Sequence, residues 1–297
     1  MIVRDKTDIF ALLFATRGSV LPKIAPRIIG LSSIAAGYVW LDTTYGPMMH
    51  TGASAFAVFG VALSLFLGFR NNAAYDRWWE SRKLWGQLIA DLRSLGRETD
   101  IFVGSSSRRQ AILRGAIGFM HLHRLNLRGL SRDAAAERWI EPHWHEAAHP
   151  PCAMLDHLAS ELTEARTAGE IDGFGAKALT ERLASITLAQ AGCERIANTP
   201  LPYVYSLLVF RTTWLYCLLL PVGIVDSAGW LTPAFTAVVA YVFFGLAEVT
   251  EELGKPFGKT VNGLPLDAMC RTVEISIAPH LGEAPPERLK PQNYYLS

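Results

Sequence analysis

The segment TGASAFAVFGVALSLFLGF, residues 51–69, contains no charged side chain. Its length lies within the range of roughly 17–25 apolar residues that a helix needs to cross a bilayer. Within it, Val61, Leu65 and Phe69 recur every four residues and therefore share one face of a helix. By periodicity alone, such a stripe more often packs against other helices than lines a pore, so both interpretations stay open. The segment also holds small residues that would let neighbouring helices approach closely, namely Ala57, Gly60, Ala62, Ser64 and Gly68.

The composition predicts a mixture of apolar spans and a large water-facing part. Of the 297 residues, 50% are hydrophobic and 19% are charged, and 28 Lys and Arg against 27 Asp and Glu give a formal net charge of +1. This composition excludes a disordered chain. The pI of about 7.7 argues against nucleic-acid binding through overall basicity, and the mean hydropathy of +0.20 argues against a chain that lies wholly in the membrane.

The cysteines carry no signature of a disulfide scaffold or a zinc ribbon, because they are far apart and form no C-x-x-C pair. We expect reduced and mostly buried thiols at Cys152, Cys193, Cys217 and Cys270.

Three further runs with few or no charges predict four membrane spans in two hairpins. In the first hairpin, residues 28–41 precede a polar turn at 42–47, and the span 51–69 follows. Residues 28–41 are long enough only if flanking residues join them. In the second hairpin, residues 196–225, with the single charge Arg211, and residues 230–247 flank a polar turn at 226–229. The alternative, a soluble protein with unusually buried helices, fits such long uncharged runs less well.

The positions of Lys and Arg predict the orientation in the membrane. Neither hairpin turn holds a basic residue. Basic residues stand before the first span and after the second, at Arg4, Lys6, Arg17, Lys23, Arg27, Arg70, Arg77, Arg82 and Lys83. The positive-inside rule then places both termini and the middle segment in the cytoplasm. We expect no cleavable signal peptide, because the start leads into no short apolar core with a cleavage site.

Outside the spans the pattern is helical, and the fold class is therefore all-α. Residues 75–95 have helical spacing, residues 105–107 offer a cap for a helix over 108–127, and helical periods return at 152–168 and 174–197. We expect a short helix at residues 132–139 and a loop at residues 141–151. The Pro-rich residues 278–297 predict an extended arm or a disordered tail. We divide the chain into the first hairpin (1–70), a helical cytoplasmic region (71–199), the second hairpin (200–250) and a cytoplasmic C-terminal segment (251–297).

Three groups of residues are candidates for chemistry, and each has a simpler interpretation. The first is a group of histidines, His121, His123, His143, His145, His149 and His157. Because His-x-His places two side chains on different faces of a helix, surface or packing roles fit better than a zinc site. Cys193 has no His beside it in sequence, so we expect a structural role. Glu248, Glu251 and Glu252 stand at the inner end of the last span. Carboxylates near a membrane are costly and so indicate pairing or an ion path, but these three could equally lie just outside the bilayer and hold a cytoplasmic helix.

Four motifs, in order along the chain, resemble those of bestrophins, especially the bacterial members. They are FLGFRNNAAYDRWWE at residues 66–80, GCERIANTPLPY at 192–203, EELGKPFG at 251–258 and LPLDAMC at 264–270. The order of spans and polar segments is similar as well, and the resemblance covers about residues 1–277.

The resemblance implies a homopentameric ion channel of the plasma or inner membrane, in which the second membrane helix of each subunit lines a central pore. By position in the motif, Val61, Leu65 and Phe69 would form three apolar rings of a narrow neck that gates by dewetting. A second constriction would lie near Phe174, where the local match is poor and a Phe between two glycines could equally anchor a loop. The implied partners are further copies of the chain, membrane lipids and permeant monovalent ions. We expect no nucleic acid, cofactor, metal ion or catalytic residue.

The sequence departs from the animal bestrophins at two points. Where those proteins have an acidic run that binds Ca²⁺, residues 259–263 read KTVNG, so we expect opening without Ca²⁺. The predicted neck also holds Val and Leu in place of the aromatic rings to which anion preference is linked, so the choice between anions and cations stays open. Two other classes of function remain: a non-conducting membrane scaffold, and a membrane-embedded enzyme with a metal at the histidines or at Glu251 and Glu252.

Overall fold

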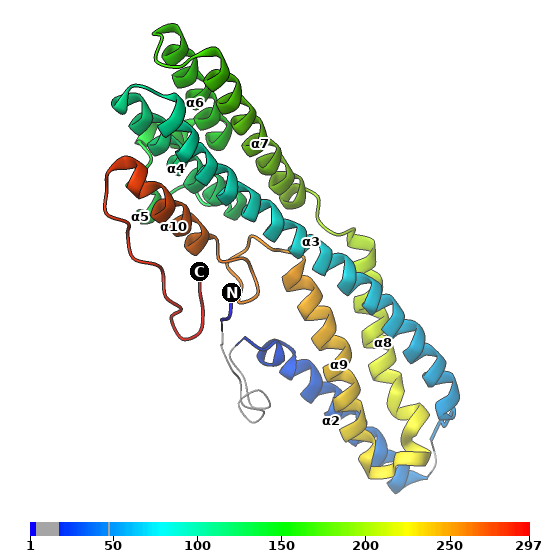
Figure 1. Ribbon diagram of the computed structural model, residues 1–297. Helices are drawn as coiled ribbons and strands as arrows, with labels where there is room; N and C mark the ends of the chain where they lie inside the picture. The colour runs from blue at the N-terminus through cyan, green and yellow to red at the C-terminus, as the bar shows by residue number, and fades with distance from the viewer. Residues whose placement is uncertain (4–17, 47) are drawn as a thin grey trace. The chain divides into compact units, whose positions relative to one another are not determined.

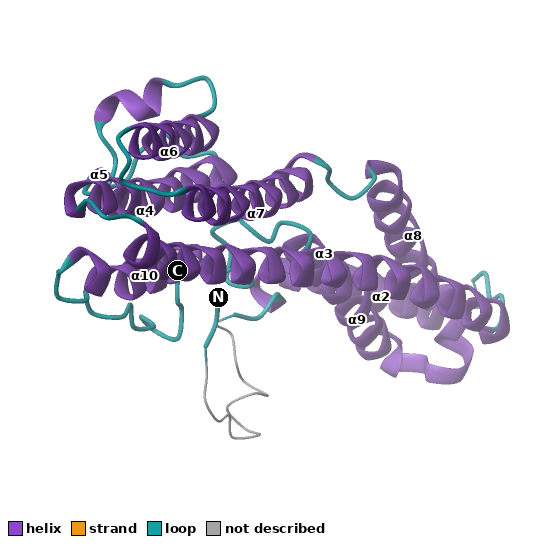
Figure 2. Ribbon diagram, turned by 45° about the horizontal axis from the view of Figure 1, so that its top comes forward, coloured by secondary structure: helices purple, strands orange, loops and turns teal. Residues whose placement is uncertain are grey.

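The computed structural model describes residues 1–3, 18–46 and 48–297, and these residues are mainly helical (Figure 1). The helices are α2 (Leu21–Tyr45), α3 (Ala53–Phe102), α4 (Ser106–Arg128), α5 (Ala134–Glu137), α6 (Pro150–Thr167), α7 (Gly173–Asn198), α8 (Tyr203–Ala228), α9 (Thr232–Leu253) and α10 (Leu266–Ile277), with short 3-10 helices at Pro142–Glu146, Gly229–Leu231 and Ala278–Leu281. Within the described residues, β geometry is limited to isolated bridges such as that between Ile2 and Tyr295 (Figure 2). The all-α fold class is confirmed.

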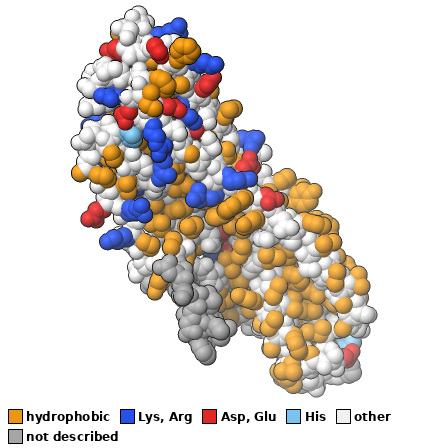
Figure 3. Space-filling view, viewed as in Figure 1, with side chains coloured by type: hydrophobic (Ala, Val, Ile, Leu, Met, Phe, Trp, Pro, Cys, Tyr) orange, Lys and Arg blue, Asp and Glu red, His pale blue; other side chains and the backbone are white. Residues whose placement is uncertain are grey.

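The chain forms two compact units, and the boundary between them falls inside α3. The apolar unit consists of Asp5–Trp78 and Pro200–Lys255, and the polar unit consists of Met1–Arg4, Trp79–Thr199 and Pro256–Ser297. In Figure 3 the visible face of the apolar unit is largely hydrophobic, whereas Lys, Arg, Asp and Glu are scattered over the visible face of the polar unit. Four residues used in the predictions above lie outside the described residues. They are the basic residues Arg4, Lys6 and Arg17, and Pro47 of the first predicted turn.

The core of the apolar unit joins α2, the first part of α3, α8 and α9. Its buried side chains are Ile24, Leu31, Leu63, Leu67, Val209, Cys217, Ala240, Phe243 and Phe244. A Cβ atom at Gly60 would lie 2.7 Å from the Tyr216 hydroxyl, so the absence of a side chain there lets α3 approach α8. At Gly68 a Cβ atom would meet nothing within 4 Å, so this second small residue has no such role among the described residues.

Three helical stretches are long and apolar enough to cross a membrane: Leu21–Tyr45, Ala53–Phe102 and Tyr203–Leu253, the last of which contains both α8 and α9. The prediction of a turn beginning at residue 42 was wrong, because α2 continues to Tyr45 and ends at Gly46, whose φ of 97° breaks the helix. The Asp42 carboxylate accepts the backbone N–H of Met48 at 2.7 Å, beyond the end of the helix. Likewise α8 continues to Ala228 and ends at Gly229, whose φ is 49°.

The polar unit confirms the predicted cap of α4, corrects one predicted segment and decides between the two alternatives for the C-terminal residues. Ser105 Oγ accepts the backbone N–H of Arg108 at 3.4 Å. The expected loop at residues 141–151 contains the 3-10 helix Pro142–Glu146, and α6 begins within it at Pro150, a helix position where proline costs no hydrogen bond. The C-terminal stretch is an ordered arm: Leu296 N–H donates to the Met1 carbonyl at 2.9 Å, and Ala268 N–H donates to the Ser297 carbonyl at 2.9 Å.

Candidate functional site

Two opposite faces of α3 differ in how much of their side-chain surface is exposed. Leu63, Leu67 and Ala74 are buried. Val61, Leu65 and Phe69 are 69%, 57% and 63% exposed, and we call these three residues the neck face. At about 100° of rotation per residue, the neck face lies on roughly the opposite side of the helix from the buried set. A single chain therefore packs one side of α3 and leaves large apolar side chains uncovered on the other, among them Val58, which is 71% exposed.

The same side of α3 becomes polar beyond the neck face. Asn72 and Asp76 follow Leu65 by seven and eleven residues, which are close to two and three whole turns of a helix. Both side chains are exposed. An uncovered apolar stripe thus continues into a polar one along a single line of the helix.

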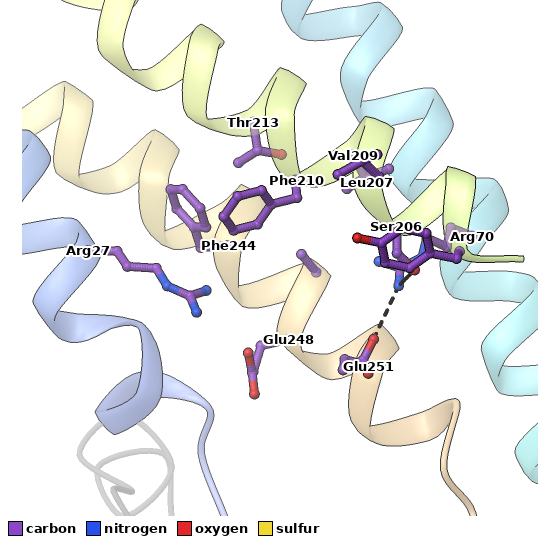
Figure 4. Close-up of a pocket in the computed structure, with 12 residues that line it drawn as sticks. Arg27, Arg70, Ser206, Leu207, Val209, Phe210, Thr213, Phe244, Glu248 and Glu251 are labelled. Carbon is purple, nitrogen blue, oxygen red and sulfur yellow. Dashed lines mark hydrogen bonds and ion pairs between the residues drawn. The ribbon is translucent and has the colours of Figure 1, made fainter. Parts of the chain in front are cut away.

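The two arginines of the same motif point away from this line and hold α3 against α8 and α9. Arg70 donates to Ser206 Oγ at 2.8 Å and lies 3.3 Å from a carboxylate oxygen of Glu251 (Figure 4). Arg77 Nε donates to the carbonyl of Gly254 at 2.8 Å. The conspicuous basic residues of the motif therefore have structural partners within the apolar unit.

The three glutamates at the end of α9 are all paired with basic groups. Lys23 Nζ lies 3.1 Å from Glu248 and 2.6 Å from Glu252, of which Glu252 is buried. Glu251 meets Arg70 and also lies 2.8 Å from Lys255 Nζ. All three carboxylates therefore have basic partners, and their role in an ion path or as structural groups stays a prediction.

A contact that the sequence did not predict joins the opposite ends of these helices. His50, in the connection between α2 and α3, places Nε2 2.8 Å from Asp42 and Nδ1 2.6 Å from Asp226. The hydrogen bond with Asp42, together with the charges of Asp226 and Asp42, raises the pKa of His50 above its usual range, although desolvation opposes this shift. A signal was present, since Asp42, His50 and Asp226 are the charged or readily protonated side chains in or beside the two predicted turns, but their separation in sequence concealed the contact.

Phe174 lies at the start of α7 in the polar unit and is 83% exposed. The Asp172 side chain caps the helix by accepting the backbone N–H of Gly175 at 2.6 Å. A Cβ atom at Gly175 would lie 2.7 Å from Cβ of Phe102, so this glycine permits α7 to begin against the end of α3. Phe174 is thus helical and its ring is uncovered within one chain, and its place at a second constriction stays a prediction.

His121, His123 and Cys193 have packing environments in the polar unit, whereas His143 is exposed. His121 Nε2 lies 2.8 Å from Glu274, and the ring of His123 stacks between Trp85 and Phe119. Burial, with a small contribution from His149, lowers the pKa of His123 to about 3. Burial, with the charges of Glu194 and Glu80, raises the pKa of Cys193 to about 12, which leaves it a poor nucleophile. No group of three or more His, Cys, Asp or Glu among the described residues is arranged to hold a metal ion.

The remaining thiols agree with the predicted reduced state. All four cysteines are free, and three of them, Cys193, Cys217 and Cys270, are buried, whereas Cys152 is exposed.

A family model described as bacterial and fungal bestrophin protein matches residues 1–279. The chain belongs to the bestrophin family. This bestrophin is 44% identical to a voltage-dependent anion channel-forming protein of Mesorhizobium japonicum, over 100% of this chain and 97% of that protein. It is 36% identical to a protein of the same description from Escherichia coli K12, over 99% of each. Among solved structures, the crystal structure of a bacterial bestrophin homologue from Klebsiella pneumoniae matches with a TM-score of 0.81 at 28% identity, covering 90% of this chain and 100% of that one.

The resemblance inferred from the four motifs is thereby confirmed. Membership in the bestrophin family and the apolar helices identify this bestrophin as a membrane protein. Family and relatives point to an ion channel and away from an enzyme.

Proposed function

We propose that this bestrophin forms an ion channel for small monovalent ions, whose pore is lined by the neck face of α3. The observation that carries this proposal is the uncovered state of Val61, Leu65 and Phe69 on the side of α3 opposite its packed side. An exposed apolar stripe on a membrane helix meets either lipid or further copies of the chain, and the position of these three residues in the bestrophin motif implies further copies. A ring of subunits around one axis brings them together as three consecutive apolar rings.

Such rings can close the pore to ions without a separate blocking segment. An apolar constriction of this kind excludes water and stops ions until it widens, while polar side chains on either side rehydrate the ion. Asn72 and Asp76 supply polar groups on the same side of α3 immediately beyond the neck face. We assign Phe174, uncovered at the start of α7, to a second and cytoplasmic aperture of the same pore.

The assembly proposed here is a homopentamer, the number that the bestrophin resemblance implies. Native mass spectrometry of the purified protein is expected to give five times the 32.7 kDa of one chain. A dimer or a monomer would contradict a pore built around a ring of α3 helices.

The proposed orientation places both termini and residues 71–199 and 251–297 in the cytoplasm, with spans at the hairpins 1–70 and 200–250 of a plasma or inner membrane. Lys23, Arg27, Arg70 and Lys255 gather at one end of the apolar unit, whereas the other end holds Asp42, His50 and Asp226. Basic residues favour the cytoplasmic side.

The relatives named as anion channel-forming proteins support anions as the permeant ions. A cation pathway is the second candidate, because Asp76 places a carboxylate on the pore side of α3, where repeated copies would attract cations.

The test is a recording of the purified protein in a planar bilayer with a potassium chloride gradient. A reversal potential near that of chloride supports the anion channel, and one near that of potassium supports the cation channel with Asp76 as its selectivity group. Assembled protein without conductance, in the wild type and in neck-face variants, would support the scaffold alternative.

A further inference from the structure

The apolar unit contains a cavity of about 370 Å³ between α2, α3, α8 and α9. Its volume lies within the range of roughly 300–1,000 Å³ that is typical of small-molecule sites. Figure 4 shows the Arg27 side chain extended from α2 toward Phe244 and Glu248 of α9. The cavity is separate from the neck face, whose residues do not line it.

The charges around this cavity leave one cation without an anionic partner. Glu248 is held by Lys23 at 3.1 Å, and Glu251 is held by Lys255 at 2.8 Å and by Arg70 at 3.3 Å. Arg27 forms no ion pair with any carboxylate in the part of the chain that the structure describes. Its guanidinium carbon instead lies 5.7 Å from the centre of the Phe244 ring, a cation–π contact that leaves its N–H donors available.

The remainder of the wall is mainly apolar. Leu207, Phe210, Phe244 and Ala247 line it from α8 and α9. A ligand that fits therefore has an anionic group for Arg27 and a hydrocarbon part for this wall. A free phosphate or chloride ion would satisfy the arginine but would leave the apolar wall without a partner.

The position of the cavity along the helices points to the source of such a ligand. It lies at the end of the apolar unit where Lys23, Arg27, Arg70 and Lys255 gather, and where the positive-inside rule places the inner membrane surface. Basic pockets between membrane helices at this depth bind lipid headgroups.

We propose that this cavity binds one phospholipid of the inner leaflet, with the phosphodiester hydrogen-bonded to Arg27 and the start of an acyl chain against Phe210 and Phe244. Arginine recognises phosphate through paired N–H donors, which explains the choice of arginine at a position where a lysine would supply only a point charge. The site requires insertion in a membrane and does not depend on ion conduction, so a failure of the channel proposal leaves it standing.

The experiment is native mass spectrometry of the full chain in detergent, titrated with dioleoyl phosphatidylglycerol. The matched probes are dioleoyl glycerol, which has the same chains without phosphate, and glycerophosphate, which has the phosphate without chains. The wild type is expected to retain phosphatidylglycerol at concentrations about tenfold lower than dioleoyl glycerol, because one charge-assisted hydrogen-bonded pair contributes about that factor. It is expected to retain glycerophosphate about tenfold less well too, because that probe buries no hydrocarbon against the apolar wall.

Three variants locate the binding. Arg27→Gln removes the guanidinium and Ala247→Phe fills the apolar part of the cavity, and each is expected to weaken binding about tenfold. Arg211→Gln, an exposed arginine of α8 that does not line the cavity, is the control and is expected to bind as the wild type does.

Equal binding of phosphatidylglycerol by the wild type and Arg27→Gln would overturn the proposal. Equal binding of dioleoyl glycerol would exclude a phosphate site, and equal binding of glycerophosphate would assign the site to a free phosphate. Because the assembled mass is read in the same spectrum, a variant that fails to assemble is recognised directly, and the other variant then decides.

Discussion

Nδ1 of His50 lies 2.6 Å from a carboxylate oxygen of Asp226, which joins the connection between α2 and α3 to the end of α8. The other ring nitrogen, Nε2, lies 2.8 Å from Asp42. A neutral imidazole donates at one nitrogen only, whereas the protonated ring donates at both. The geometry around His50 therefore fits the charged form, and the two helical hairpins are tied together by a group whose pKa is raised above that of an unperturbed histidine.

This arrangement predicts a pH-dependent stability that belongs to His50. Because its pKa is raised in the folded protein, the stabilisation is fully present below about pH 6.5, the pKa of an unperturbed histidine, and is lost as the pH rises through the folded-state value. The melting temperature of the wild type should fall over this range, and that of His50→Gln should fall less. His143→Gln, at an exposed pair with Glu141, is the control and should retain the wild-type profile. Identical profiles for the wild type and His50→Gln would contradict the assignment.

Asp267 holds two buried arginines of α4 in the polar unit. It accepts from Arg128 at 2.6 Å and also from Arg124, which pairs in addition with Asp133. Burial alone would raise the pKa of Asp267, but hydrogen bonds from Arg128 and Ser297 and the arginine charges lower it to about 2. Its stabilisation is present above the ordinary pKa of about 4 and is lost as the pH falls toward 2.

Replacement of Asp267 by Asn is therefore expected to destabilise the polar unit by about 3 kcal/mol, because it removes the carboxylate that pairs with the buried Arg128 guanidinium, whereas Arg124 keeps Asp133. The denaturant midpoint of the purified protein measures this loss. Asp156→Asn, an exposed residue of α6, should change stability by less than about 0.5 kcal/mol. Equal effects of the two substitutions would show that the Asp267 ion pairs contribute little.

Channel activity is expected to persist when Ca²⁺ is removed. The connection between Pro256 and Leu264 is a tight turn closed by hydrogen bonds from Leu264 N–H to the Pro256 carbonyl at 2.7 Å and from Gly263 N–H to the Thr260 carbonyl at 3.2 Å. It offers no carboxylate, and Ca²⁺ sites commonly include one or more. Open probability in bilayers should be the same with millimolar Ca²⁺ and with excess chelator. A loss of current on chelation would show a calcium site elsewhere in the assembly.

Phe174 provides a test of the cytoplasmic aperture. Because its ring is uncovered within the chain, Phe174→Ala should alter stability by less than about 0.5 kcal/mol while it increases the unitary conductance by widening the exit. Phe174→Leu keeps an apolar side chain of similar length and should have a smaller effect. An unchanged conductance in Phe174→Ala would remove this residue from the ion path.

The long elements of this fold could be predicted from the sequence, because uncharged runs and helical spacing are local properties. The residues at which these elements end could not be predicted in the same way. Asp42 interrupts an apolar run, yet its carboxylate caps the following backbone at Met48, so α2 continues until Gly46 breaks it. The continuity of α3 through Arg70 and the Trp78–Trp79 pair likewise depends on partners such as Ser206 that lie far away in sequence.

The candidate site, too, could be predicted from the sequence only in part. The spacing of Val61, Leu65 and Phe69 predicts that they share a face, and the family motif predicts their role. Which side of α3 is left uncovered depends on its packing against α8 and α9, and sequence periodicity does not give it. The pairing of Lys23 with Glu248 and Glu252, the His50 contacts and the cavity at Arg27 all join distant segments, so only the folded arrangement reveals them.

The central claim is that the uncovered side of α3 lines the ion path, and Leu65 and Leu67 test it as a matched pair. They lie two residues apart, but Leu65 is 57% exposed and Leu67 is fully buried. Leu67→Ala is expected to cost about 2–5 kcal/mol of stability through the cavity it creates, without raising the conductance of assembled channels.

The decisive measurement is the unitary conductance of Leu65→Ala beside those of Leu67→Ala and the wild type in the same bilayer. The account predicts that Leu65→Ala assembles normally and conducts more, or opens where the wild type stays closed, because its apolar ring is wider. If Leu65→Ala instead conducts as the wild type does, or loses assembly as a core substitution would, the neck face does not line the pore.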